Sequence, residues 1–144
     1  MEHIEWQSLL RLGNQCFEER QWDQAEYFFS EAYDTLAFAY RNDPLSSDLL
    51  NAWLCVCHNL SSLYESLGNL KLSLRFLMIP HDYLTEVTNS DCLNEDIKLI
   101  AFNGMNITLN PIMQFAQRHP MCEDCKRKLV QLQQLLGQEN QPIH

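Results

Sequence analysis

Apolar residues recur along most of this chain at spacings of three and four residues, which is the period of an amphipathic α-helix. No stretch shows apolar and polar residues alternating between hairpin turns, as a β-strand would. The pattern therefore predicts an all-α protein of about six helices, the first near residues 3–20 and the last near residues 121–136. The predicted core positions are Trp6, Leu9, Leu10, Gly13, Phe17, Ala25, Phe29, Ala32, Leu36, Ala39, Leu50, Trp53, Leu54, Cys57, Leu60, Tyr64, Leu70, Leu74, Leu77, Leu84, Val87, Ile97, Ala101, Gly104, Thr108, Ile112, Phe115, Leu129, Leu132 and Leu135 or Leu136.

Capping and helix-breaking residues separate the predicted helices from one another. Pro44 stops the second helix, because proline cannot continue the hydrogen-bond ladder, and Gly68 supplies a left-handed turn after the third. Further caps and stops are expected at Ser46, Ser47 or Asp48, at Asn89-Ser90-Asp91, at His119-Pro120 and at Gly137.

Two prolines, Pro80 and Pro111, fall inside predicted helices. The spacing of apolar residues continues in register on both sides of each of them. Each helix is therefore expected to be kinked or broken at its proline, with Asn110 as a new cap if the second one breaks.

The short links between helices predict antiparallel pairs, so the fold expected is three stacked helix hairpins. A chain of 144 residues fits one domain, here residues 1–137, and residues 138–144 are expected to form a frayed tail.

The net charge of the chain disfavours two classes of binding partner. Ten basic and nineteen acidic residues give a net charge of −9, which disfavours nucleic acid and anionic membranes. The sequence starts without a basic segment followed by an apolar run, and no stretch approaches a membrane span, so a cytoplasmic location is expected.

One repeat signature is visible in the first hairpin. A large residue, a Leu-Gly pair, an aromatic, and then alanine, aromatic and alanine follow one another at Leu9, Leu12, Gly13, Trp22, Ala25, Phe29 and Ala32. This pattern resembles the tetratricopeptide repeat, in which small residues let two helices approach and large ones fill the surrounding space.

A second, weaker unit follows in Asn59-Leu60-Ser61, Tyr64, Gly68, Ser73 and Leu77, with Pro80 in the place of Ala32. Leu12 and Leu60 are 48 positions apart, whereas the repeat of the resembled family has about 34 residues, so longer helices are expected. The resemblance covers roughly residues 6–80, and the third hairpin matches only by its helical period.

The resemblance implies a concave surface lined by the first helix of each hairpin, which holds peptides or partner helices. It places Arg11, Asn14, Glu18, His58, Asn59 and Ser62 on that surface. Leu10 stands where the family's basic clamp would have a lysine, so a ligand with a terminal carboxylate is not implied.

Three asparagines on the fifth helix could extend this surface. Asn103, Asn106 and Asn110 share one helix face, and an amide offers a peptide backbone both a donor and an acceptor. The alternative is a neutral solvated face on which Asn110 acts as a helix cap.

Self-association is a competing use of the surface, because a short solenoid without polar capping helices leaves apolar edges that could form a homodimer. Trp6, Trp22 and Tyr40 are the candidate edge residues, although core or groove packing suits them better.

The six cysteines suggest two different roles. Cys16, Cys55, Cys57 and Cys92 occupy or adjoin apolar helix positions, where a reduced thiol packs as a small hydrophobe. His119, Cys122 and Cys125 instead resemble half of a zinc site or a redox dithiol, but no fourth ligand lies nearby. His81, Cys92 or His144 could complete the zinc site only if the fold brings one of them close.

Catalytic motifs are absent from the sequence, which has no phosphate-binding glycine loop, nucleophile elbow or His-Glu-x-x-His helix. The acidic cluster Glu18, Glu19, Asp23 and Glu26 is typical of a solvated surface. The sequence therefore favours a non-enzymatic protein- or peptide-binding or assembly module without a cofactor. A metal-binding or thiol redox sensor is the alternative.

Overall fold

A computed structural model describes residues 5–91, 93–119 and 127 of the chain. In this part the structure contains five α-helices and no strand. Their bounds are α1 (Trp6–Glu18), α2 (Trp22–Asn42), α3 (Ser47–Ser66), α4 (Leu70–Thr88) and α5 (Glu95–Arg118). The all-α prediction is confirmed for these residues, whereas the predicted sixth helix and the frayed tail lie outside them.

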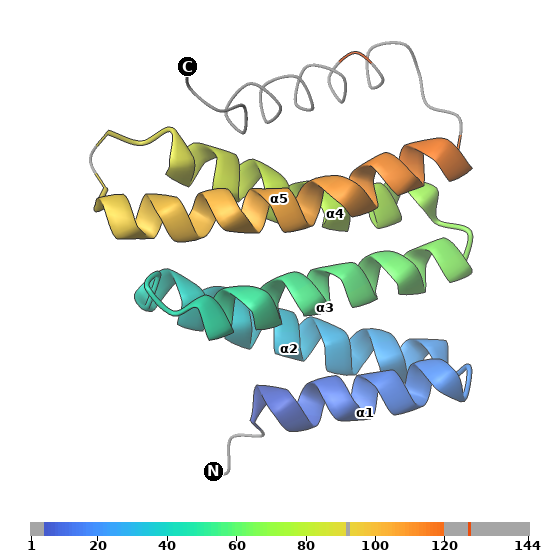
Figure 1. Cartoon of the computed structure of the whole chain (residues 1–144). Helices are drawn as coiled ribbons and strands as arrows, with labels where there is room; N and C mark the ends of the chain where they lie inside the picture. The colour runs from blue at the N-terminus through green and yellow to red at the C-terminus, as the bar shows by residue number, and fades with distance from the viewer. Residues whose placement is uncertain (1–4, 92, 120–126, 128–144) are drawn as a thin grey trace.

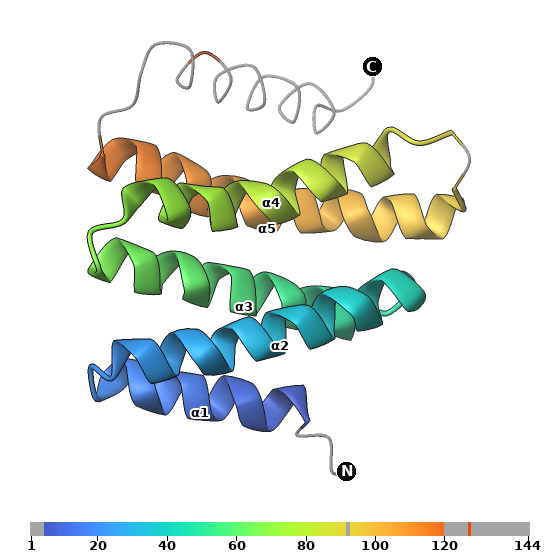
Figure 2. The same ribbon diagram turned by 180° about the vertical axis from the view of Figure 1, so that it is seen from behind.

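The five helices form two layers. Helices α1, α3 and α5 lie side by side in one layer, and α2 and α4 form the layer behind them, as Figures 1 and 2 show from opposite sides. Each helix packs on the next one along the chain, and α3 also contacts α5. No helix in the described part is long and apolar enough to cross a membrane.

Aromatic side chains from α2, α3 and α4 form the centre of the core. The ring of Tyr40 stacks on that of Trp53 with 5.8 Å between centroids, and Tyr83 meets Trp53 edge to face at 5.7 Å. Tyr33 and Tyr64 both pack on Phe76. Shared aromatic contacts therefore make a large part of the interface between the first two hairpins.

Two glycines lie where a neighbouring helix leaves no room for a Cβ atom. A Cβ atom at Gly13 would lie 2.5 Å from two ring carbons of Phe29 on α2. At Gly104 on α5 it would lie 2.9 Å from Leu84 Cδ1 and 3.1 Å from Leu50 Cδ2. The small residues at these two positions thus allow α1 to pack on α2, and α5 to pack on α3 and α4.

The structure contains the predicted cap of α3 and the predicted left-handed turn before α4. The Ser46 side chain accepts a hydrogen bond from the backbone N–H of Leu49 (3.2 Å), and Gly68 has the left-handed φ of 78° expected before α4. The Asn69 side chain accepts from the N–H of Leu72 (3.2 Å). Helix α2 ends at Asn42, just before the predicted stop.

One predicted helix end is close and another is wrong. Helix α1 ends at Glu18, two residues before the end expected near residue 20, because Arg20 adopts a left-handed φ of 59°. The N-cap of α5 is Asn94, whose side chain accepts from the N–H of Asp96, and not Asn89, Ser90 or Asp91. The acidic residues Glu95 and Asp96 follow this cap, where the positive end of the helix dipole favours them.

Of the two outcomes expected at Pro80 and Pro111, a kink or a break, the break does not occur. Both prolines lie inside continuous helices, so Asn110 is an interior residue of α5 and not a cap. A proline removes one hydrogen bond of the ladder. Here the packing around it compensates, because Pro80 lies within a buried face of α4 that includes Leu77, His81 and Leu84.

Several predicted core positions are corrected as well. Leu70 is 39% exposed, and Ser73 and His81 take buried positions on α4 instead. Tyr40 rather than Ala39 is fully buried at the end of α2. Cys55 is exposed while Cys57 is buried, because residues two apart on a helix point to different faces.

Replacing Ser46 with alanine is expected to lower the free energy of unfolding by about 1 kcal/mol, because the N–H of Leu49 loses its acceptor. Urea denaturation followed by circular dichroism measures this change. Replacement of the neighbouring exposed Ser47, which is not the cap, should change the free energy of unfolding by less than half as much; equal effects would contradict the capping role.

Candidate functional site

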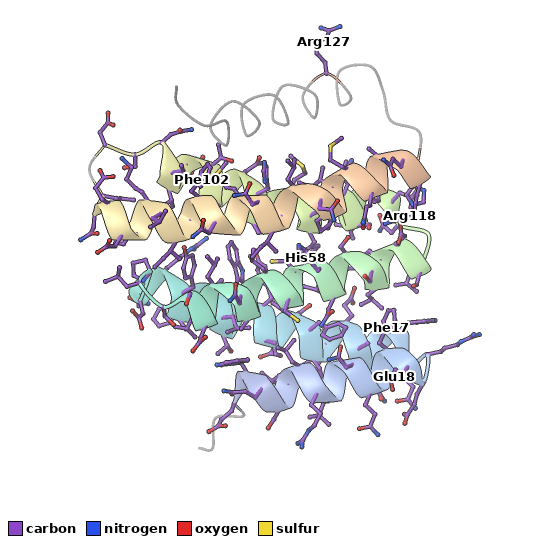
Figure 3. The ribbon with its side chains drawn as sticks, in the orientation of Figure 1. Phe17, Glu18, His58, Phe102, Arg118 and Arg127 are labelled. Carbon is purple, nitrogen blue, oxygen red and sulfur yellow. The ribbon has the colours of Figure 1, made fainter. Side chains whose placement is uncertain are left out.

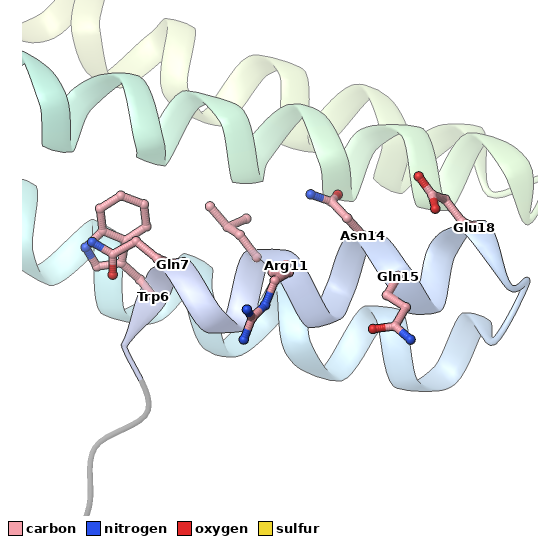
Figure 4. A pocket seen from close by; sticks show the side chains of 7 residues that line it. Trp6, Gln7, Arg11, Asn14, Gln15 and Glu18 are labelled. Atoms are coloured by element: carbon pink, nitrogen blue, oxygen red, sulfur yellow. The ribbon is translucent and has the colours of Figure 1, made fainter.

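A first hollow runs along the exposed side of α1. Its lining residues come from this helix alone, and Figure 4 shows them from close by: Trp6, Gln7, Leu10, Arg11, Asn14, Gln15 and Glu18. Trp6 and Leu10 are half-buried and give this hollow an apolar wall, while Arg11 and Glu18 place opposite charges along it.

A second hollow of about 210 Å³ lies between α1 and α3. Phe17 and the fully buried Phe29 supply its apolar lining, and Asn14, Asn59 and Ser62 supply its polar groups. The amide nitrogen of Asn59 donates to the amide oxygen of Asn14 at 3.3 Å, so the two asparagines join α1 and α3. The amide nitrogen of Asn14 and the amide oxygen of Asn59 have no hydrogen bond within the described residues.

A third hollow of about 340 Å³ lies between α3 and α5, with Leu77 of α4 also in its lining. Its other lining residues are His58, Ser61, Ser62, Glu65, Pro111, Gln114 and Arg118, and Figure 3 labels His58 on α3 and Arg118 at the end of α5. The first and second hollows share Asn14, and the second and third share Ser62. We call the three together the α1–α3–α5 groove.

An ion cluster closes one end of the third hollow. Glu65 Oε2 lies 3.0 Å from Arg118 Nη2 and 2.7 Å from His119 Nε2. Partial burial alone would raise the pKa of Glu65, but the hydrogen bonds from His119 and Arg118 outweigh it, so the pKa is lower than usual. The charges of Glu65 and Arg118 compensate each other, which leaves this end of the groove close to neutral.

His58 contributes an uncharged group to the same hollow. Burial lowers the pKa of His58, and its Nε2 atom is buried without a hydrogen-bond partner within the described residues. At neutral pH the imidazole is therefore neutral. The groove thus offers amide, hydroxyl and imidazole groups over an apolar floor, with the Glu65–Arg118–His119 cluster at one end.

The structure places all six groove residues expected on the first two hairpins in the lining of the hollows: Arg11, Asn14, Glu18, His58, Asn59 and Ser62. Asn103, Asn106 and Asn110 are exposed on α5 but line none of the three. The expectation that these three asparagines extend the surface is therefore not supported by the groove's lining. The last two turns of α5 contribute Pro111, Gln114 and Arg118 in their place.

Sequence reasoning missed Phe17 and Phe29 as groove residues, because the helical period marks them only as core. It also missed Glu65, Gln114 and Arg118. Gln114 follows Asn110 on one side of α5 and could have been found by extending that face by one turn. The pairing of Glu65 with Arg118, 53 residues apart, leaves no signal in a single sequence.

The alternative metal site is only partly within the described residues. His119 is engaged with Glu65, and Cys122 and Cys125 lie outside the described part, as does Cys92. Among the described residues no group of three or more histidine, cysteine, aspartate or glutamate side chains could hold a metal ion. In the acidic cluster, Glu26 accepts a hydrogen bond from the Tyr64 hydroxyl at 2.7 Å and joins α2 to α3.

The candidate edge residues have different environments. Tyr40 is buried in the core and presents no surface to a second copy. Trp6 and Trp22 are half-buried, and the ring of Trp22 packs edge to face on Phe17 at 5.4 Å.

A family model described as "Protein of unknown function (DUF2753)" matches residues 4–143. Neither a curated protein nor a solved structure matches the chain.

Proposed function

This chain belongs to the DUF2753 family, whose description assigns no function, and from the chain's own surface we propose that it is a non-enzymatic module that binds a peptide or protein segment. The binding surface in this proposal is the α1–α3–α5 groove. The proposal includes no cofactor and no catalytic step.

The observation that carries the proposal is the pair of asparagines above two phenylalanines. One hydrogen bond joins Asn14 and Asn59, which leaves the amide NH2 group of Asn14 and the amide carbonyl oxygen of Asn59 for a ligand. A peptide backbone presents the complementary C=O and N–H groups. Phe17 and Phe29 beneath them offer apolar contact to a ligand side chain.

The continuity of the groove favours an extended ligand over a small molecule. The three hollows share Asn14 and Ser62 and follow α1, α3 and α5 in turn. Such a series matches a chain with several side chains better than a compact metabolite, for which an enclosed cavity is usual. The charges at the two ends, Arg11 with Glu18 and Glu65 with Arg118, are balanced, which favours a ligand of low net charge.

We also propose that the fold is a short solenoid similar to tetratricopeptide repeats, with residues 121–136 as the sixth helix that completes the third hairpin. The two-layer arrangement of the described helices is consistent with it. Leu99 and Ile107, at 59% and 50% exposed, leave an apolar part of α5 available to a further helix.

Selection of peptides from a displayed random library tests the binding function. Selected peptides should bind the wild-type protein and lose at least about tenfold in affinity for the Asn14→Ala/Asn59→Ala variant, because two hydrogen bonds of about 1 kcal/mol each are removed. Fluorescence anisotropy of the labelled peptides measures the affinity.

The matched control is the Asn103→Ala/Asn110→Ala variant, which removes two exposed asparagines of α5 that line none of the three hollows. Its affinity should stay within about twofold of wild type, since no contact is lost. Circular dichroism checks that each variant is folded. A library that yields no binder, or binders that respond equally to both pairs of substitutions, would count against the groove.

A further inference from the structure

A second surface, on the layer opposite the groove, runs along the outer side of α2. Asp23, Tyr27, Glu31, Asp34 and Phe38 follow one another at steps of four, four, three and four residues, so they share one helix face. All five are exposed. We call this set the α2 stripe; α2 lies beside α4 in the layer that faces the viewer in Figure 2.

The two aromatic residues of the stripe contribute little to the fold. Phe38 is 73% exposed and Tyr27 is 61% exposed, the highest values among the large hydrophobic residues of the described part. The ring contact of Tyr27 is with its neighbour Phe28 on the same helix. Single exposed apolar side chains are common on protein surfaces, but two on one stripe, three turns apart, form an apolar face that a partner can cover.

The acidic residues of the stripe are not neutralised by ion pairs within the part of the chain that the structure describes. Asp23, Glu31 and Asp34 take part in none of the ion pairs among the described residues. Two basic groups lie toward the α4 side of α2: Arg41 lies over the ring of Tyr83 at 5.6 Å, and Arg75, like Arg41 and Asp34, interacts electrostatically with Tyr33. The stripe therefore combines two exposed aromatic rings with three negative charges that form no ion pair within the described residues.

We propose that the α2 stripe is a docking surface for a lysine- or arginine-rich amphipathic helix of a partner protein. The stripe spans 15 residue steps of an unbroken helix, about 22 Å at 1.5 Å per residue, which matches about four turns of a second helix. Apolar side chains of the partner cover Tyr27 and Phe38, and its cationic side chains pair with Asp23, Glu31 and Asp34.

The negative charge of the α2 stripe favours a cationic partner helix over a second copy of this chain, nucleic acid or an anionic membrane. A second copy of this chain would bring the same three acidic residues against the stripe, in a protein whose net charge is −9. Nucleic acid and anionic lipid would be repelled in the same way. Only a cationic partner gains from both the charges and the rings.

A designed helical peptide of about 18 residues, with leucines along one face and lysines beside them, is a suitable probe. NMR spectra of the full-length protein should show peptide-induced shifts concentrated at residues 23–42 of α2. The Glu31→Lys/Asp34→Lys variant and the Phe38→Ser variant should each bind the peptide at least about tenfold more weakly, because one reverses the charge complementarity and the other removes an apolar anchor.

The Glu19→Lys/Glu86→Lys variant is the matched control, since it makes the same change in net charge at two exposed acidic residues outside the stripe. It should retain at least half of the wild-type affinity. Equal weakening by both charge-reversal variants would show non-specific attraction and would overturn the proposal. So would full binding by the Phe38→Ser variant, or no binding of the peptide to the wild-type protein. This test involves no residue of the groove, so its result is independent of the proposed function.

Discussion

Replacing Gly13 with valine is expected to lower the free energy of unfolding by about 3 kcal/mol, because the new side chain overlaps the ring of Phe29. Even the Cβ atom alone would lie 2.5 Å from Cδ1 and from Cε1 of that ring. Phe29 is fully buried in the core, so any displacement of its ring disturbs the packing around it. Urea denaturation followed by circular dichroism gives the change in free energy.

Two further variants identify the cause. The Gln7→Val variant places the same side chain at an exposed position of α1 and should cost less than about 1 kcal/mol, the difference in helix propensity. In the Gly13→Val/Phe29→Leu double variant the smaller leucine should relieve the overlap. The double variant should therefore lose less free energy of unfolding than the sum of the losses in the two single variants. If Gly13→Val costs no more than Gln7→Val, α1 does not depend on this close approach to α2.

Lowering the pH from 7.5 to 5.5 is expected to destabilise the protein through two histidines. Burial lowers the pKa of both His81 and His58, whereas in the unfolded chain a histidine has a pKa of about 6.5. Below that pH the unfolded chain takes up protons that the folded chain does not. The free energy of unfolding therefore falls as the pH falls, by up to about 1.4 kcal/mol per pH unit for each histidine, until the pKa of the folded state is reached.

The environment of His81 explains why it stays neutral. Its Nδ1 atom lies 2.7 Å from the hydroxyl oxygen of Thr108, and that hydroxyl donates to the carbonyl of Met105 at 3.0 Å. The hydroxyl oxygen must then accept from Nδ1–H, which assigns the proton to Nδ1. The Nε2 atom is buried and has no hydrogen-bond partner in the described part, so a proton added there would be a buried charge without an acceptor.

The pH dependence is measured as the difference in unfolding free energy between pH 7.5 and pH 5.5. The His58→Gln/His81→Gln variant should lose much less of its free energy of unfolding over this range than the wild type, whatever its stability at pH 7.5. Glu65 does not contribute to the change measured between pH 7.5 and pH 5.5. The pKa of its carboxyl is lowered, so the stabilisation that the ionised carboxylate gives to the fold is lost only at more acidic pH. A variant with the same pH dependence as the wild type would disprove the role of the two histidines.

The sequence predicted the helices well where a local signal marks their ends. Ser46 caps α3, Gly68 makes the left-handed turn, and α2 ends before Pro44, each for a reason that lies in one or two residues. At Pro80 the sequence left a kinked helix and a broken helix as alternatives. The helix is unbroken there because its buried neighbours hold it, and no single sequence reports that packing.

The sequence predicted the part of the groove that α1 and α3 form, but not the part that α5 forms. The resemblance to tetratricopeptide repeats placed Asn14 and Asn59 on one surface, and they are joined by a hydrogen bond. It could not place the contribution of α5, because where α5 lies beside α3 depends on close contacts such as that of Gly104 with Leu50 and Leu84. The contact of Glu65 with Arg118 and His119 follows from the same packing.

The alkylation rate of Cys55 tests the central claim, peptide binding in the groove, most directly. Cys55 is an exposed free thiol on α3 that lines none of the three hollows, but its sulfur lies 4.0 Å from the amide nitrogen of Asn59, so a peptide bonded to Asn59 would pass beside it. Cys16 and Cys57 are buried and serve as internal references. Alkylation at each cysteine is followed by peptide mapping, with and without a selected peptide at saturation. The proposed function predicts that the bound peptide slows alkylation of Cys55 in proportion to occupancy; an unchanged rate at full occupancy would contradict binding in the groove.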